Sequence, residues 1–147
     1  MDGSQQQQQQ ALATVQAAWA AYEAGSPDFF DFFTADASIF ALYPSTRLNG
    51  REAFRTSGAF QGAHPSRAVQ LLNAEVRPLG EAVLVTCHER TRSDYNSVDH
   101  RITFLLVPEG DGLKIAHLHM SPLLRGARLD TRGLVEDVTT VQVLKKP

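Results

Sequence analysis

The sequence has only one cysteine, Cys87, so a disulfide within the chain is excluded. It also has little excess charge, because 14 basic and 16 acidic residues leave a net charge of −2. Such a balance offers no basic surface to nucleic acid or to an anionic membrane, and we expect neither as a partner. No apolar run approaches the roughly 20 residues that cross a bilayer. The first residues lack the basic and then apolar pattern of a secretory signal, so we expect a cytoplasmic protein.

The 147 residues, 43% of them hydrophobic, suit one domain that buries a core without disulfides or metal. Phosphate-cradling, Ser-His-Asp and Cys-His motifs are not recognisable in the sequence, and we expect no cofactor. Residues 1–10 are polar and glutamine-rich, and we interpret them as a tail, although glutamine can also prolong a helix. Apolar spacings of three and four predict a helix with one buried stripe over 11–24.

The chain after this helix is predicted to contain two short helices and five strands. The helices are expected over 26–33 and 51–60, and the strands over 38–43, 68–79, 81–93, 97–107 and 112–122. Helices followed by a run of strands predict an α+β domain with an antiparallel sheet that has the helices on one face. Because long strands twist, the sheet should curl around the first helix as an open cone whose mouth is a pocket. We expect the domain to cover 11–123 and the extension 124–147 to be an edge strand or a loosely packed arm.

Three phrases, in this order, resemble the nuclear-transport-factor-like superfamily of SnoaL-like cyclases, ketosteroid isomerases and the association domain of calcium/calmodulin-dependent kinase II. They are TADASIF at 34–40, NGREAF at 49–54 and GLKIAHLHMSP at 112–122. The last phrase is similar to the I-x-H-x-H-x-S ending of SnoaL-like and kinase-association domains. The resemblance implies a SnoaL-like cone. It implies the isomerase fold without the isomerase base, because apolar residues occupy the matching stretch of the first strand.

The last phrase contains His117 and His119, which strand alternation places on one side, opposite Ala116, Leu118 and Met120. The small and apolar set suits the concave, pocket-lining side, and the resemblance points the same way. The two histidines are then expected to face outward and to lie in a subunit interface, with catalysis as the alternative. A metal site is disfavoured, because zinc takes three or four ligands.

Two neighbouring predicted strands have polar residues on one face, and this face is either solvated or a polar wall of the pocket. His88 and Arg90 share a face of one strand, and Asp99 and Arg101 share a face of the next. The resemblance places Arg101 at a position similar to a pocket arginine of kinase association domains, with Arg90 or His88 as the second polar group. Such a pocket favours a carboxylate-bearing ligand.

The sequence therefore favours a small-molecule-binding, SnoaL-like domain that forms a homodimer or a higher homo-oligomer. The expected ligand-binding residues are Arg101, Arg90, His88, Tyr43, Leu118, Met120 and Trp19, with core packing as the alternative for Trp19. The dimer is expected from an apolar outer sheet face of Val83, Val85, Cys87 and Ile115. One alternative function is an oligomerisation module like the kinase association domain. Another is a cyclase, isomerase or hydrolase that uses His88 or Asp99 as its base.

Overall fold

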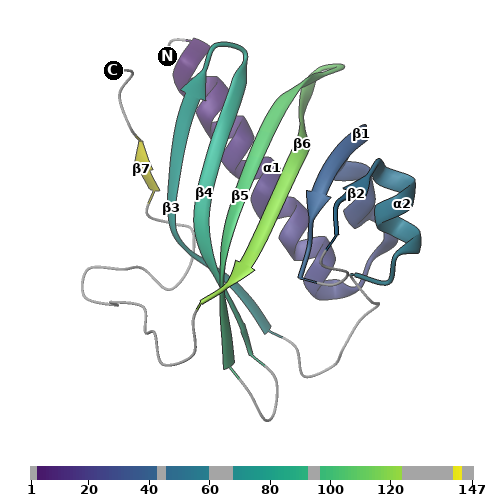
Figure 1. Ribbon diagram of the computed structural model, residues 1–147. Coiled ribbons are helices and arrows are strands. Elements are labelled where there is room, and N and C mark those ends of the chain that lie inside the picture. Colours follow the sequence, from purple (N-terminus) through teal and green to yellow (C-terminus); the bar gives the residue numbers. More distant parts are fainter. Residues whose placement is uncertain (1–2, 43–45, 60–67, 93–96, 124–140, 144–147) are drawn as a thin grey trace.

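The computed structural model describes residues 3–42, 46–59, 68–92, 97–123 and 141–143. The helical elements are α1 (Gly3–Ala24), the 3-10 helix η1 (Pro27–Phe32) and α2 (Arg51–Thr56). The strands are β1 (Phe33–Phe40), β2 (Leu48–Asn49), β3 (Ala68–Leu79), β4 (Ala82–Arg92), β5 (Ser97–Glu109), β6 (Gly112–Pro122) and β7 (Val141–Val143). All strands join one curved sheet in the order β2-β1-β6-β5-β4-β3-β7, and α1 crosses one face of it (Figure 1). The predicted α+β class is confirmed.

Helix α1 begins at Gly3, so the described part of the glutamine tract lies within the helix and is not a separate tail. Two glutamine side chains of this tract reach the turns between strands. The Nε2 group of Gln7 donates to the carbonyl oxygens of Gly80 at 3.2 Å and Glu81 at 2.5 Å, and that of Gln10 donates to the carbonyl of Asp111 at 3.5 Å. The tract thus ties α1 to the turn between β3 and β4 and to the turn between β5 and β6.

The segment after α1 differs from its predicted form in length and in helix type. Residues predicted as a helix form η1, which Ser26 caps by accepting a hydrogen bond from the Asp28 amide at 3.2 Å. Strand β1 starts directly after η1, five residues earlier than predicted, because Phe33 already points into the core. The rings of Phe33 and Phe54 lie 5.1 Å apart, and both side chains are fully buried. This aromatic contact anchors α2 against β1.

The sheet is mixed, which corrects the prediction of an antiparallel sheet. Strands β3 to β6 form the expected antiparallel meander, and β3 and β6 have the predicted bounds. However, β1 runs parallel to β6, and β7 runs parallel to β3. Of the extension at 124–147, the described residues Val141–Val143 therefore form an edge strand. The parallel pairs join segments far apart in the sequence, so no local turn signal announces them.

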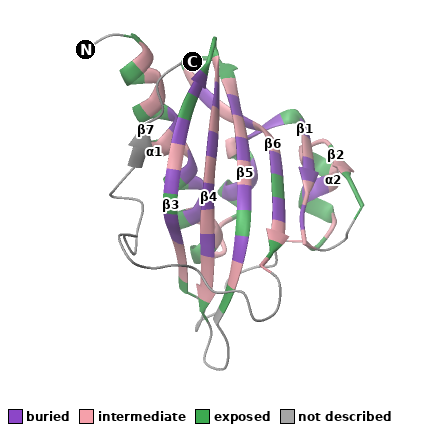
Figure 2. Cartoon of the chain, turned by 60° about the vertical axis from the view of Figure 1, so that its left-hand side comes forward, coloured by how far each residue is buried: buried purple, intermediate pink, exposed green. Residues whose placement is uncertain are grey.

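The central strands alternate between buried and partly exposed residues, as Figure 2 shows. The side that faces α1 is apolar and is formed by Val83, Val85, Cys87, Ile102, Phe104, Leu106, Ile115, Leu118 and Met120. Val83, Val85, Cys87 and Ile115 are among these core residues, so the prediction that they form an outer patch is wrong. Apolar residues that alternate along a strand mark its core side. Burial, together with the negative charge of Glu89, raises the pKa of the Cys87 thiol.

A bulge in β6 breaks the alternation that the sequence suggests for this strand. Leu105 of β5 pairs with His117, whereas the next residue, Leu106, pairs with Ile115, so Ala116 is an extra residue. Ile115 and Leu118 consequently both face the core. His117 lies on the outer face, and Ala116 does not belong to the core row, which corrects its predicted place on the concave side.

Candidate functional site

A cavity of about 220 Å³ opens where the end of α1, the residues after β1 and the end of α2 meet strands β4, β5 and β6. The lining residues are Tyr22, Leu42, Ala59, Glu89, Thr91, Val98, His100 and Met120. Half of them are apolar, and the polar ones include one carboxylate and one imidazole. This mixture is typical of ligand pockets, which combine apolar walls with a few placed polar groups.

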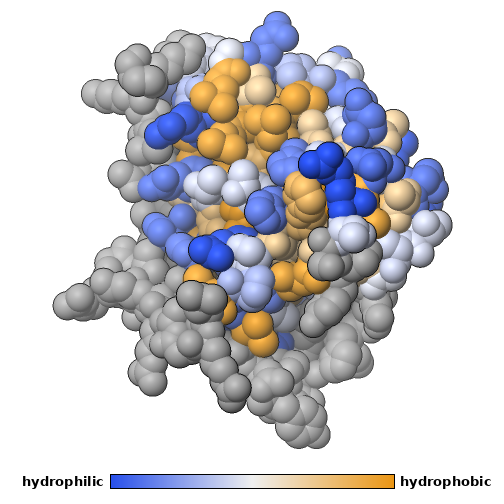
Figure 3. Space-filling model, viewed as in Figure 1, coloured by the Kyte–Doolittle hydropathy of each residue, from blue (hydrophilic) through white to orange (hydrophobic). Residues whose placement is uncertain are grey.

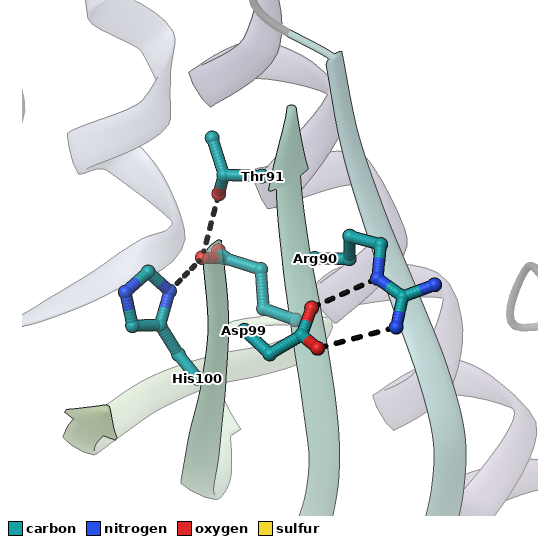
Figure 4. Close-up of polar contacts among 5 residues, drawn as sticks. Arg90, Thr91, Asp99 and His100 are labelled. Atoms are coloured by element: carbon teal, nitrogen blue, oxygen red, sulfur yellow. Dashed lines mark hydrogen bonds and ion pairs between the residues drawn. The ribbon is translucent and has the colours of Figure 1, made fainter. Parts of the chain in front are cut away.

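Glu89 is the central polar group of the site, and its side chain is almost completely buried, with 1% exposed. The indole Nε1 group of Trp19 donates a hydrogen bond to Oε2 of the carboxylate. The hydroxyl of Thr91 lies 3.1 Å from Oε1, and Nδ1 of His100 lies 3.0 Å from the same oxygen (Figure 4). Three hydrogen-bond partners offset the cost of burying a carboxylate away from water.

Strand register explains why Glu89 and His100 meet. The core side of β4 runs through Val83, Val85 and Cys87, and the next residue on that side is Glu89. On β5 the core side, followed backward through Ile102, reaches His100. Glu89 and His100 are directly paired across the two strands. The polar pair therefore continues the apolar core toward the open end of the sheet.

His88, Arg90 and Arg101 lie on the opposite, outer face of the sheet and do not line this cavity. Arg90 forms a two-point ion pair with Asp99, with distances of 2.8 Å from Nε to Oδ1 and 3.2 Å from the second nitrogen to Oδ2 (Figure 4). Arg101 is exposed, and its guanidinium lies 3.5 Å from the carbonyl oxygen of Pro122. The arginine wall predicted for the pocket is therefore absent from the cavity lining that the structure describes.

His88 pairs across the sheet with Arg101 and is half-buried. Its Nδ1 atom is buried and has no hydrogen-bond partner within the described ranges. Burial lowers the pKa of His88, the nearby Asp99 opposes this effect, and the positive charge of Arg101 adds to it. His88 and Asp99, the bases named from the sequence, are thus both on the face away from the cavity.

Of the other predicted ligand-binding residues, one lines the cavity, two are packed in the core and one lies outside the described residues. Met120 lines the cavity, and Trp19 lies behind it as a donor to Glu89. Leu118 is fully buried in the core. Tyr43 lies outside the described residues. Glu89 and most of the other lining residues were not identified from the sequence. The apolar alternation of β4 and β5 could have indicated them, because the next residues on the core side of these strands are Glu89 and His100.

His117 and His119 lie on the outer face beside β1. Nδ1 of His117 lies 2.7 Å from the hydroxyl of Ser38, and the ring of Phe40 lies 5.9 Å from that of His117 and 5.4 Å from that of His119. The guanidinium of Arg47 covers Phe40 at 4.9 Å. These contacts form an amphipathic surface at one edge of the outer face. The interface role of the two histidines stays a prediction.

The described residues form neither a cluster of metal ligands nor a membrane-spanning helix. Within this part of the chain, no three His, Cys, Asp or Glu side chains are arranged to hold a metal ion. None of its helices has the length and hydropathy that would let it cross a membrane.

A model of the SnoaL-like domain matches residues 11–125, and no curated protein matches the sequence. The association domain of CaMKII from C. elegans aligns with a TM-score of 0.71 and 16% identity over 82% of this chain and 99% of that one. A candidate calcium/calmodulin-dependent protein kinase type II association domain from Thiobacillus denitrificans aligns with a TM-score of 0.64 and 24% identity. The alignment covers 76% of this chain and 93% of that one. A candidate ketosteroid isomerase from Parabacteroides distasonis aligns with a TM-score of 0.65 and 16% identity over 78% of this chain and 86% of that one. At these identities the solved structures share the fold.

Proposed function

The chain belongs to the SnoaL-like domain family, and we propose that it binds a small, largely apolar organic molecule in the cavity beside Glu89. The observation that carries this proposal is an open cavity, half of whose lining residues are apolar, that ends at the buried and hydrogen-bonded pair of Glu89 and His100. A volume of about 220 Å³ corresponds to about seven water molecules at ~30 Å³ each. This space suits a molecule built on one ring.

The charge of the lining changes the ligand class expected from the sequence. A carboxylate-bearing ligand was predicted from Arg101 and Arg90, and both lie on the outer face. The described lining contains the carboxylate of Glu89 and neither lysine nor arginine. A second carboxylate beside Glu89 would be repelled and would have no lysine or arginine in the described lining to pair with. We therefore favour a neutral ligand.

A ligand panel with a matched pair of variants tests the proposal. Val98 lines the cavity and is 43% exposed, whereas Leu79 is 48% exposed at the far end of β3 and does not line it. A ligand that binds the folded state raises the melting temperature by mass action. We expect single-ring neutral compounds to raise it for the wild type and for Leu79→Trp, and to lose this effect for Val98→Trp. A panel without any response, or equal responses of both variants, would contradict the proposal.

We also propose that the chain forms homo-oligomers through the outer face of the sheet. Leu84 of β4 and Leu105 of β5 are paired on this face and remain partly exposed. Figure 3 shows hydrophobic residues gathered over the upper part of the face, with polar and further hydrophobic residues mixed below them. Several structural neighbours are described as CaMKII hub or association domains. This observation supports the second candidate function, an assembly module, and sedimentation equilibrium at tens of micromolar tests it: a monomer would contradict it.

A further inference from the structure

The hydrogen bonds of Glu89 determine which atom of His100 is available to a ligand. Trp19 donates to one carboxylate oxygen, and Nδ1 of His100 meets the other at 3.0 Å. Because a carboxylate only accepts hydrogen bonds, Nδ1 carries the hydrogen in this contact. In the neutral imidazole the lone pair then lies on Nε2, which becomes a hydrogen-bond acceptor.

The Nε2 atom of His100 is turned away from Glu89, as Figure 4 shows. The residue lines the cavity, yet only 7% of it is exposed. Among the described residues, the ring of His100 makes its hydrogen bond through Nδ1. Nε2 of His100 is not one of the buried polar atoms that lack a partner, so it is accessible from the cavity. A donor on a bound molecule can take the place of water at this acceptor.

The surroundings of Nε2 restrict the rest of the ligand. Leu42, Val98 and Met120 offer only apolar surface, and Ala59 adds a methyl group. The carboxylate of Glu89 already has three partners and needs no donor from the ligand. His100 thus offers a ligand an acceptor in this wall, beside the hydroxyl groups of Tyr22 and Thr91.

We propose that the ligand is a neutral molecule with a hydroxyl or amide N–H group that donates to Nε2 of His100, while its apolar body contacts Leu42, Val98 and Met120. This inference rests on the proposed function, because it names the ligand class of the same cavity. It excludes organic carboxylates as the preferred ligands.

Three probes of similar shape test the inference. They are p-cresol, p-xylene and p-toluate, which present a hydroxyl, a methyl and a carboxylate group on the same methyl-substituted ring. We would measure their dissociation constants by NMR titration of the full chain at pH 7.5. We expect p-cresol to bind about three- to tenfold more tightly than p-xylene, the gain of one net hydrogen bond. We expect p-toluate to bind more weakly than both.

Two variants assign the effect to the named atoms. His100→Phe keeps a ring but removes Nε2, so p-cresol and p-xylene should bind with equal affinity. Glu89→Gln keeps the shape and removes the charge, so the disadvantage of p-toluate relative to p-xylene should shrink. If His100→Phe does not fold, the wild-type series and Glu89→Gln still decide the question.

The outcomes separate this inference from the proposed function. If the wild type binds p-xylene as tightly as p-cresol, and Val98→Trp abolishes both, the hydroxyl inference is overturned while the cavity remains a ligand site. Tightest binding of p-toluate would also overturn it. If none of the three probes binds and the wider panel gives no response, both the inference and the proposed function are overturned.

Discussion

Glu89 of β4 and His100 of β5 face each other across the antiparallel pair, and 3.0 Å separates the Oε1 and Nδ1 atoms of their side chains. Both residues are on the core side of the sheet, at the point where the apolar interior ends and the cavity begins. Trp19 of α1 completes the arrangement from the helix side. The pair therefore links the stability of the domain to the chemistry of its cavity.

Glu89→Ala should lower the free energy of unfolding by about 3 kcal/mol, because it leaves the buried donors of Trp19, Thr91 and His100 without their acceptor. Glu89→Gln keeps one acceptor oxygen and should cost less. Urea denaturation measures both changes. Glu81→Ala, which removes an exposed carboxylate, serves as the control and should change stability by less than about 0.5 kcal/mol. A change for Glu89→Ala as small as that of the control would contradict the role of the pair.

Gln7→Ala should loosen the turn between β3 and β4, because the side chain donates to the carbonyls of Gly80 and Glu81. We expect a loss of about 0.5–1 kcal/mol in unfolding free energy and faster amide hydrogen exchange in this turn. Gln6→Ala, on the same helix and exposed, is the matched control, since it changes helix propensity equally. Equal effects of the two substitutions would show that the contact with the turn contributes nothing.

His88 should make the protein less stable in acid. Burial lowers the pKa of His88 in the folded state, so the unfolded chain binds its proton more readily. The contribution of His88 to the free energy of unfolding is complete above pH 6.5, the ordinary pKa of histidine. It decreases as the pH falls below this value. Urea denaturation between pH 5 and 8 should show a shallower pH dependence for His88→Gln than for the wild type. Identical slopes would contradict this assignment.

Leu105→Glu should weaken self-association, because it places a charge on the apolar row that Leu105 forms with Leu84 on the outer face. Ala17→Glu adds the same charge to the exposed side of α1 and should leave the association unchanged. Sedimentation equilibrium of the wild type and both variants measures the effect. A wild-type oligomer that survives Leu105→Glu would place the interface elsewhere.

The sequence carried enough information to predict the strands of the meander, because their apolar alternation and the turn glycines are local signals. The hairpin residues Gly80 and Gly110 adopt positive φ values of 65° and 60°, which glycine accommodates at little cost. The parallel pairing of β1 with β6 and the bulge at Ala116 were not predictable in this way. Both depend on how segments distant in the sequence pack together, and no local sequence pattern indicates either of them.

The polar residues that the sequence analysis placed in the pocket wall lie on the face away from the cavity, for an identifiable reason. Sequence reasoning grouped polar residues such as His88 and Arg101 and interpreted them as a pocket wall. The apolar residues of the same strands already mark the core side, and that side continues into Glu89 and His100. Glu89 and His100, polar residues at core positions near a strand end, were therefore the indicators of this cavity.

The single tryptophan of the chain allows the most direct test of ligand binding in the cavity. The indole N–H of Trp19 donates to Glu89, which lines the cavity, so its one resonance in a ¹H–¹⁵N spectrum reports on the site. Titration with p-cresol should shift this resonance in a saturable manner in the wild type and in Leu79→Trp, in which the Trp19 signal is assigned separately. The shift should be absent in Val98→Trp, whose added ring fills the cavity. A Trp19 resonance that stays unchanged in the wild type up to millimolar p-cresol and across the neutral panel would contradict the account.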